Sequence, residues 1–398
     1  MSDTLSIRSL YVHIPFCERK CEYCDFTSIA GTAGADAYIE ALIAEIRMLG
    51  ERLPGIELDT VFIGGGTPSL IEPRQLAAVI DSVGSAFRVT RHAEVTLEAN
   101  PSSTSVGRAS VWRGAGANRV SLGVQSLEPD ILSFLGRVHD AQRALDAVAE
   151  VRAAGFESVN CDLIYAVPGL DDARWARTVQ RVIGTSPDHL SCYELTVEPG
   201  TPLHTNVRRG RVTPVDADVA LGQHRLAEDL LTSAGYAQYE VSNFARPDHM
   251  CRHNLAYWHN RHYLAAGVGA HGHVPAAAAR QLGLAVPSDA VAVRYWHGRG
   301  IAAFAANVRD GVLPIRDHEC LDATTREEER IMLGLRLQEG VALTDDAVVA
   351  EALRLQRRGL IAFDGAVARA TPHGENVLNA VTLRLTDALH LAPVISGP

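Results

Sequence analysis

The sequence predicts an α/β fold, in which six parallel strands and their crossover helices form a partial (β/α)6 barrel and a smaller α+β module follows at the C-terminus. Short apolar runs rich in β-branched residues alternate with longer helical patterns over roughly the first 190 residues, which is typical of a parallel sheet. The chemically unusual residues come directly after the strands, where ligands bind in parallel α/β folds. We expect a barrel rather than a doubly wound sheet because all these residues then gather on one rim.

The six predicted strands are separated by amphipathic helices. Pro73 lies near the start of one helix, and Gly155 and Gly184 end two others, which agrees with the preference of proline for the first turn and of glycine for the C-terminal end. Six strands are too few for a complete eightfold barrel. We assign the strands to Ser9–Ile14, Leu58–Ile63, Ala93–Ala99, Ala117–Val124, Ser158–Tyr165 and His189–Leu195, and the helices to residues 35–50, 73–87, 140–155 and 171–184.

Three regions are expected along the chain: the barrel over residues 1–205, an extension of the barrel over residues 206–315 and the C-terminal module over residues 316–398. The extension contains a stretch rich in proline, alanine and glycine over residues 274–287, which predicts a loop. The last region contains three predicted helices around a short hairpin, an order that resembles a winged helix. These helices span residues 325–338, 345–358 and 372–386.

The chain is acidic. Its 398 residues include 37 lysines and arginines against 47 aspartates and glutamates, a formal net charge of −10. Nucleic-acid binding needs a clustered basic face, so we expect no DNA or RNA partner. The N-terminus lacks a signal-peptide pattern and no apolar run is long enough to cross a bilayer. We therefore expect a cytoplasmic protein without a transmembrane segment, in a reducing compartment where its seven cysteines form no disulfide framework.

Three of the seven cysteines follow the first strand in the spacing C-x3-C-x2-C, as Cys17, Cys21 and Cys24. A structural zinc site takes four ligands, commonly in two close pairs, so zinc remains an alternative but matches poorly. A [4Fe-4S] cluster normally takes four thiolates. With three, one iron keeps an open position that a small chelating ligand can fill, and S-adenosylmethionine offers an amino and a carboxylate group for this purpose.

Other polar residues end the remaining strands. The glycine-rich loop GGGTPS, residues 64–69, follows the second strand, and absent side chains allow a ligand to approach its backbone closely. Glu98 ends the third strand, Gln125 the fourth, and Asp162 lies near the end of the fifth. These three residues have an alternative interpretation, in which they cap helices or satisfy hydrogen bonds inside the barrel.

The motifs YVHIPFC, EYCDF, GGGTPSL, LEANP, SLGVQS and CDLIYAVPGL, taken in order, resemble the radical SAM superfamily and, within it, the oxygen-independent coproporphyrinogen III oxidase family. The resemblance covers nearly the whole chain and implies a radical SAM partial barrel whose three cysteines hold a [4Fe-4S] cluster. It implies that Tyr11, Gly65 and Glu98 contact one S-adenosylmethionine. It also implies a set of residues that hold a second one in the oxidases: Tyr23, Gly66, Thr67, Gln125, Arg137 and Asp162.

Two departures set this chain apart from the oxidases. Those enzymes carry a further cysteine two residues after the third, where this chain has Phe26, and a longer N-terminal arm than the sixteen residues before Cys17. The segment HNLAYW, residues 253–258, instead matches an HNxxYW pattern associated with haem binding in the haem-chaperone branch of the family. Neutral imidazole is a good axial ligand for haem iron, and neighbouring aromatic rings can stack on the macrocycle.

This branch of the family implies His253 as the haem ligand, with Cys251, His271 and His273 as alternatives. A histidine followed by aromatic residues is also typical of a packed core. The resemblance thus leads to two hypotheses of function. The first is a haem chaperone that delivers haem to acceptor proteins, including membrane-associated respiratory enzymes. The second is a radical enzyme that acts on a tetrapyrrole, as a coproporphyrinogen III dehydrogenase or as a haem-modifying enzyme.

Overall fold

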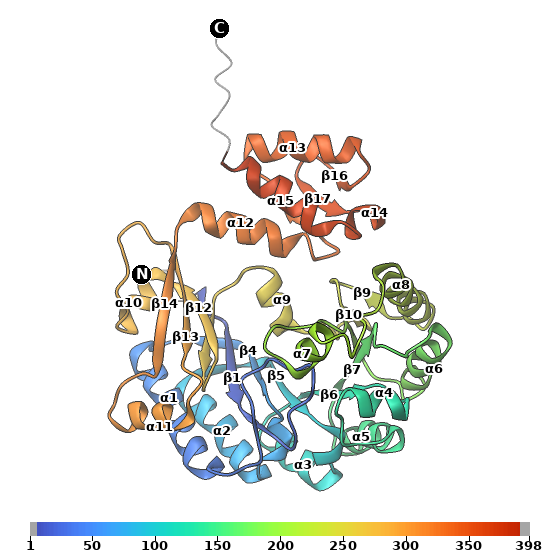
Figure 1. Ribbon diagram of the computed structural model, residues 1–398. Helices are drawn as coiled ribbons and strands as arrows, with labels where there is room; N and C mark the ends of the chain where they lie inside the picture. The colour runs from blue at the N-terminus through green and yellow to red at the C-terminus, as the bar shows by residue number, and fades with distance from the viewer. Residues whose placement is uncertain (1–5, 391–398) are drawn as a thin grey trace.

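The computed structural model describes residues 6–390 and is built around one sheet of twelve strands (Figure 1). Its six central strands are parallel neighbours in chain order, which confirms the predicted partial barrel. Two predicted strands, at residues 9–14 and 158–165, have the observed bounds. The central strands are β1 (Ser9–Ile14), β4 (Glu57–Gly65), β5 (Arg88–Ala99), β6 (Arg119–Gln125), β7 (Ser158–Tyr165) and β8 (His189–Glu194).

Helices cover the outer face of these strands (Figure 1). The helix predicted from Pro73 begins there behind a capping box formed by Glu72 and Gln75, and the side chains of Asp140 and Asp171 cap the next two predicted helices. Two barrel helices, α3 and α4, were not identified from the sequence. The helices up to β8 are α1 (Ala35–Arg52), α2 (Pro73–Ala86), α3 (Val106–Gly114), α4 (Pro129–Phe134), α5 (Ala141–Ala153) and α6 (Asp172–Ile183).

The inner face of the barrel is polar, and this property defines the site. Val120, Leu122 and Val124 of β6 pack into the core beneath the helices, whereas the alternate residues of the strand line a cavity. Neighbouring strands show the same alternation, because successive side chains of a strand point to opposite faces. The inward residues are Arg119, Ser121, Gly123 and Gln125 on β6, Asn160, Asp162 and Ile164 on β7, and Ser191 and Tyr193 on β8.

Residues beyond 205 extend the sheet at both edges. Next to β1, parallel β11 is followed by an antiparallel run of three strands, and β8 is flanked by a short hairpin. The loop predicted over residues 274–287 is wrong in part, because residues 276–281 form a helix rich in alanine, the best helix former. The elements are α7 (Pro202–Arg208), α8 (Ala217–Ser233), β9 (Ala237–Gln238), β10 (Asn243–Ala245), α9 (Arg252–Trp258), β11 (Tyr263–Ala266), β12 (His271–Pro275), α10 (Ala276–Gln281), β13 (Ala292–His297), α11 (Ile301–Arg309) and β14 (Ile315–Leu321).

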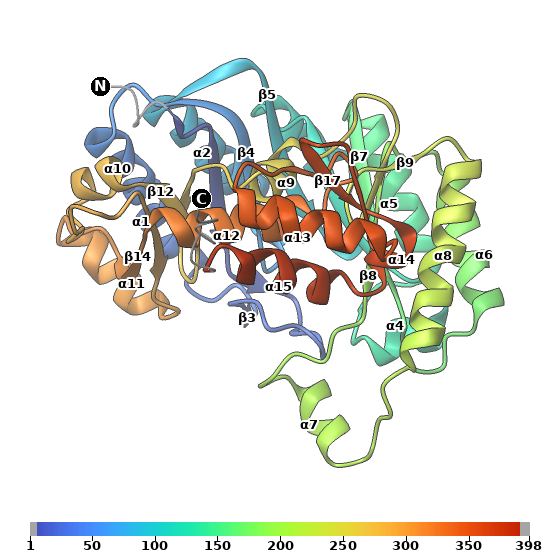
Figure 2. The ribbon, with the colours of Figure 1, turned by 90° about the horizontal axis from the view of Figure 1, so that it is seen from above.

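The C-terminal residues form a second hydrophobic core, which includes Ile331, Phe363 and Leu385. In Figure 1 this module lies above the barrel, and α12 contacts α9. Seen from above, its helices lie across the central strands (Figure 2). The predicted boundary at residue 316 falls inside β14, which pairs with β13 of the main sheet, and the division into three regions remains a prediction, as does the likeness to a winged helix. The elements are α12 (Ala323–Gly334), β15 (Val341–Ala342), α13 (Asp346–Arg357), β16 (Ile361–Phe363), β17 (Val367–Ala370), α14 (Pro372–Glu375) and α15 (Leu378–Ala388).

Within residues 6–390, no helix has both the length and the apolar character needed to cross a membrane.

Candidate cofactor site

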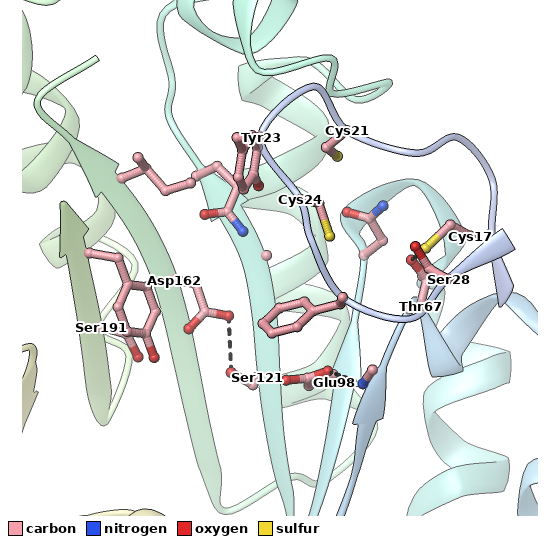
Figure 3. Close-up of a pocket in the computed structure, with 18 of the residues that line it drawn as sticks. Cys17, Cys21, Tyr23, Cys24, Ser28, Thr67, Glu98, Ser121, Asp162 and Ser191 are labelled. Carbon is pink, nitrogen blue, oxygen red and sulfur yellow. Dashed lines mark hydrogen bonds between the residues drawn. The ribbon is translucent and has the colours of Figure 1, made fainter. Parts of the chain in front are cut away.

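A cavity of about 650 Å³ fills the barrel lumen, which is a usual size for a small-molecule site. It begins beneath the loop that carries the three cysteines and ends against α9, which contributes Asn254 and Tyr257 to its lining. Figure 3 shows the cysteine loop above side chains that point inward from the central strands. Twelve of the thirteen predicted site residues line this cavity: Tyr11, Cys17, Cys21, Tyr23, Cys24, Gly65, Gly66, Thr67, Glu98, Gln125, Arg137 and Asp162.

The cysteine loop is anchored at its base by two short strands. Backbone pairing of β2 (Phe16–Cys17) with β3 (Ile29–Ala30) closes it. The Thr67 hydroxyl donates to the Cys17 sulfur at 3.7 Å, and the Arg137 guanidinium donates to the Cys21 sulfur at 3.6 Å. Both donors stabilise negative charge on sulfur, which is the form that binds metals.

The chemistry of the three thiols fits a multi-iron cluster. Burial raises the pKa of Cys24 to about 11 and also raises the pKa of Cys17, so iron binding would release protons from them. Among the described residues, no three cysteine, histidine or carboxylate side chains form a group that would hold a single ion. A cubane binds each thiolate through a separate iron, so it does not require three ligands around one ion.

The glycine loop after β4 packs directly against the cysteine loop. Gly66 donates its N–H to the Ile14 carbonyl at 2.8 Å, and Thr67 donates to the Phe16 carbonyl at 2.7 Å. A Cβ on Gly66 would lie 2.7 Å from the Phe16 oxygen and 3.0 Å from the Cys17 sulfur, and Gly65 has a φ of +116°. Only glycine allows the two loops to approach this closely, which explains the run of glycines at the end of β4.

Glu98 lies below the glycine loop as a buried carboxylate. Its Oε2 accepts the Gly65 N–H at 2.8 Å. Burial raises the pKa of Glu98 to about 7, and the charge of Asp162 adds to this effect. A cationic group that entered the cavity would favour the ionised carboxylate. Glu98 is therefore suited to an ammonium or sulfonium ligand.

Asp162 belongs to a hydrogen-bonded network on the cavity wall. One oxygen accepts from the Ser121 hydroxyl at 3.0 Å (Figure 3). The other accepts from the Asn160 amide at 2.8 Å. The Asn160 amide also donates to Ser191 at 3.0 Å. Burial raises the pKa of Asp162, although these hydrogen bonds oppose the shift. The network fixes a row of polar groups that face the lumen.

Gln125 and Arg137 complete the rim and retain unused hydrogen-bonding groups. Gln125 has a φ of 65°, which is uncommon for a residue other than glycine. The Gln125 Oε1 and the Arg137 Nε are buried and have no hydrogen-bond partner among the described residues. Arg137 holds the rim by donating to the Gly123 carbonyl at 2.9 Å and to Asn100. Orphaned polar atoms beside a glycine cradle fit a ligand rich in hydrogen-bonding groups, such as S-adenosylmethionine.

Tyr11 and Tyr23 add aromatic surface to the cavity. The Tyr11 hydroxyl is 3.0 Å from the Nδ1 of His13, and its ring stacks on Phe62 with centroids 6.3 Å apart. Burial raises the pKa of both tyrosines, so both hydroxyls remain neutral. Apolar walls with a few polar groups are typical of ligand pockets.

His253 is buried in α9 at the far end of the lumen and does not line the cavity. Its Nδ1 is 2.8 Å from the Thr60 hydroxyl and its Nε2 is 2.8 Å from the Tyr257 hydroxyl. The ring also stacks on Phe62 at 5.2 Å, and burial lowers the pKa of His253 to about 3. Coordination of iron by either nitrogen requires one of these hydrogen bonds to break. His253 as a haem ligand remains a prediction.

The alternative haem ligands differ in access. Cys251 is buried, and its thiol donates to Glu94 at 3.5 Å; burial raises the pKa of Cys251 to about 12. His273 is buried, and its Nε2 is 2.9 Å from the Arg326 guanidinium. His271 is exposed and stacks on Trp296 at 6.0 Å. Only His271 of the four presents its ring to solvent.

Comparison with known proteins identifies the family. The radical SAM superfamily profile matches residues 11–182. The haem chaperone HemW of Mycobacterium tuberculosis is 38% identical over 338 residues, which cover 84% of this chain and 83% of that protein. The chain belongs to the HemW family. Another relative, the mitochondrial radical S-adenosyl methionine domain-containing protein 1 of Bos taurus, is 34% identical over 96% of this chain and 88% of its own length.

The fold also matches a solved structure. Coproporphyrinogen III oxidase (HemN) from Escherichia coli, a radical SAM enzyme, aligns with a TM-score of 0.79 at 22% identity, over 96% of this chain and 91% of that chain. The family match and this fold confirm the resemblance drawn from the cysteine spacing and the strand-end motifs. Membership of the HemW family implies a [4Fe-4S] cluster and S-adenosylmethionine.

Several cavity residues of this HemW-family chain were not singled out from the sequence. Arg119, Ser121 and Asn160 line the lumen from β6 and β7. Asn254 and Tyr257, which belong to the HNLAYW segment identified from the sequence, line it from α9. A signal for the strand residues exists: RVSLGVQ alternates polar and apolar residues, whereas a parallel strand buried on both faces is commonly apolar throughout. That alternation indicates a barrel whose inside holds something polar.

Proposed function

We propose that this protein is a cytoplasmic haem chaperone that holds a [4Fe-4S] cluster and S-adenosylmethionine, binds haem and delivers it to acceptor proteins. The observation that carries the proposal is the 38% identity to a haem chaperone over 84% of the chain. Phe26 supports it, because this position carries the further cysteine in the coproporphyrinogen oxidases; its side chain is 64% exposed and lines the cavity mouth.

In this proposal Cys17, Cys21 and Cys24 hold the cluster, which when bound supplies an iron with an open coordination position and an electron for cleavage of the sulfonium. Gly65 and Glu98 receive the cationic end of S-adenosylmethionine, since Glu98 already accepts from the Gly65 N–H at 2.8 Å. Tyr11 lies deeper in the lumen, level with Phe62 of β4, and contacts the same molecule in this proposal. These residues orient the metabolite and exclude water. They can play these roles whether or not a radical is generated.

A second set is proposed around a second S-adenosylmethionine. The unpaired Gln125 Oε1 supports this role, because an amide oxygen buried without a partner is costly. Gly66 and Thr67 follow β4, on one side of β6 in the sheet, and Asp162 belongs to β7 on the other side. Tyr23 and Arg137 close the set at the cysteine loop, where Arg137 donates to the Cys21 sulfur.

For haem, we propose His253 as the iron ligand after α9 leaves its present position. The acceptors are haem proteins, including membrane-associated respiratory enzymes. The test is transfer of haem from anaerobically reconstituted protein to an apo-acceptor, followed by the shift of the Soret band. A protein that neither takes up haem nor passes it on contradicts the chaperone proposal.

The Cys24→Ala variant extends this test. It should lose the brown colour of the cluster and retain haem uptake, because His253 lies at the opposite end of the lumen. Cys320→Ala, which changes a thiol of β14 outside the cavity, is the matched control. Loss of haem uptake in Cys24→Ala alone would show that haem binding depends on the cluster.

One observation favours a radical enzyme acting on a tetrapyrrole as a second candidate. The lumen reaches from the cluster cysteines to α9 without interruption, so a substrate within it would have access to the cluster. This function requires formation of 5′-deoxyadenosine that depends on added tetrapyrrole, together with a change in tetrapyrrole mass. Absence of both products under reducing, anaerobic conditions would exclude it.

A further inference from the structure

The floor of the lumen contains a charge that neither proposed cofactor set uses. Arg119 is the first residue of β6, whereas Gln125, at the rim, is the last. Six residues of extended strand separate them by roughly 20 Å. Arg119 therefore lies near α9, at the opposite end of the lumen from the cysteine loop.

Arg119 is buried but incompletely satisfied. The residue is 3% exposed, and it lines the cavity. Its Nε has no hydrogen-bond partner within residues 6–390. Burial of a cation costs several kcal/mol unless an anion and hydrogen bonds compensate for the lost water.

The nearest protein carboxylates are committed elsewhere. Glu94, whose charge acts on Arg119, accepts the backbone N–H of Arg252 at 2.9 Å and that of His253 at 3.1 Å. Asp162 is bound by Ser121 and Asn160. The charge of Arg119 is thus balanced from a distance, while its hydrogen-bonding capacity toward the lumen remains available.

The surroundings of Arg119 suit an anion with a planar head. A guanidinium binds a carboxylate through two parallel hydrogen bonds. Ser191 and Tyr193 of β8 and Asn254 of α9 line the same lumen and offer further donors. The aromatic rings of Phe62 and Tyr257 line it as well and would contact an apolar body attached to that head.

We propose that Arg119 binds a carboxylate of the ligand that occupies the lumen. This inference rests on the proposed function, which supplies two sources for the group: a propionate of a tetrapyrrole, or the carboxylate of a second S-adenosylmethionine. An S-adenosylmethionine at the cluster would be a different molecule, because its amino and carboxylate groups would be held near the three cysteines, at the other end of the barrel.

The test measures the binding of carboxylate ligands and of analogues that lack the carboxylate. Anaerobically reconstituted full-length protein is titrated with haem and with haem dimethyl ester, followed at the Soret band. A parallel arm compares S-adenosylmethionine with its decarboxylated analogue by equilibrium dialysis. Wild-type protein should prefer the free acid by about 10- to 100-fold in one arm, as expected for a buried hydrogen bond to a charged group. That arm identifies the source of the carboxylate.

Arg119→Gln should remove this preference by weakening binding of the acid to the level of the analogue. Arg119→Lys keeps the positive charge but cannot form the paired hydrogen bonds, so it should retain a reduced preference for the acid. If Arg119→Gln does not fold, Arg119→Lys takes its place in the test. Arg309→Gln, an exposed arginine at the end of α11, is the control and should match the wild type. Iron content and circular dichroism establish that each variant is intact.

A wild-type protein that binds acid and analogue equally in both arms overturns the inference, as does a folded Arg119→Gln variant that keeps the preference. These results leave the proposed function standing if haem is still bound and transferred. If the protein binds no haem, the chaperone proposal fails, and the S-adenosylmethionine arm alone decides the role of Arg119.

Discussion

The two ends of the lumen differ in how fully their polar groups are used. At the cysteine end, the Gln125 Oε1 and the Arg137 Nε lack partners, and the three thiols are free. At the α9 end, both ring nitrogens of His253 are hydrogen-bonded and its ring is wholly buried. The first end is prepared for ligands. At the second end, the protein itself satisfies the histidine of the haem motif, whereas the Nε of Arg119 is left without a hydrogen-bond partner in the described part of the chain.

This difference teaches that a binding motif and an open site are separate properties. The cysteine spacing and HNLAYW are both family signatures, yet all three cysteines line the cavity, whereas the histidine of the second motif does not. For His253 to reach haem iron, the hydrogen bond to Thr60 or Tyr257 must be exchanged for an iron bond.

Gly66→Ala should remove the cluster. The added methyl group would lie 2.7 Å from the Phe16 carbonyl oxygen and 3.0 Å from the Cys17 sulfur, so the cysteine loop must move. Iron should fall from about four per chain to below about one, measured after anaerobic reconstitution. Gly84→Ala is the matched control, since no atom lies within 4 Å of its added Cβ. Equal iron in both variants would show that the glycine loop tolerates a side chain.

His253→Ala should destabilise the fold by about 4 kcal/mol, because it leaves a cavity and deprives Thr60 and Tyr257 of a partner. Urea unfolding of the protein without haem gives this value. His271→Ala, at an exposed ring, should cost less than about 1 kcal/mol. If His253 is also the iron ligand, haem added to wild-type protein should speed hydrogen exchange of the α9 amides; unchanged exchange together with an unchanged haem spectrum in His253→Ala would refute that role.

Glu98 should make stability fall as pH rises. Its folded-state pKa of about 7 lies above the ordinary value of 4.5, so the folded protein holds the proton more tightly than the unfolded chain does. The stabilisation is complete below pH 4.5 and is lost between about 4.5 and 7, by about 3 kcal/mol. Glu98→Gln should lack this change, so the difference between the two proteins in urea unfolding isolates it. A constant difference over this range would mean that Glu98 is ionised in the folded protein.

Glu339→Gln should have the smallest effect. The Glu339 carboxylate lies 3.4 Å from His259, close to α9, but its side chain is 66% exposed, and water screens such pairs. The free energy of unfolding should change by no more than about 0.5 kcal/mol. A larger loss would indicate that the C-terminal module holds α9 in place through this contact.

The sequence predicted the barrel well because its strands and helices carry local signals. Ser9–Ile14 and Ser158–Tyr165 are apolar β-rich runs with clear ends, and Asp140 and Asp171 cap helices in the expected manner. The helix at residues 276–281 was missed because a proline at residue 275 and neighbouring glycines suggested a loop. There the high helix propensity of four consecutive alanines outweighed the tendency of the flanking proline and glycines to form a loop.

The rim residues were predictable because each follows a strand, and strand ends converge in a parallel barrel. The residues at the α9 end of the lumen were not predictable, because their positions depend on contacts between segments that are distant in the sequence. Thr60 and His253 are separated by 193 positions, and their hydrogen bond has no sequence signature. The burial of His253 and the missing hydrogen-bond partner of the Arg119 Nε result from the assembled lumen and not from any sequence motif.

The pairing of β1 has a consequence for synthesis on the ribosome. β1 pairs with β4 on one side, but its other neighbour is β11, where Ser9 meets Tyr263. The turn after β11 also packs against the cysteine loop, since a Cβ on Gly269 would clash with the Thr27 side chain. During translation, the three cysteines therefore emerge long before β11 and the turn after it, which pack against β1 and the cysteine loop in the folded protein. If iron were delivered to a partly synthesised chain, the cysteine loop would not yet have its final conformation.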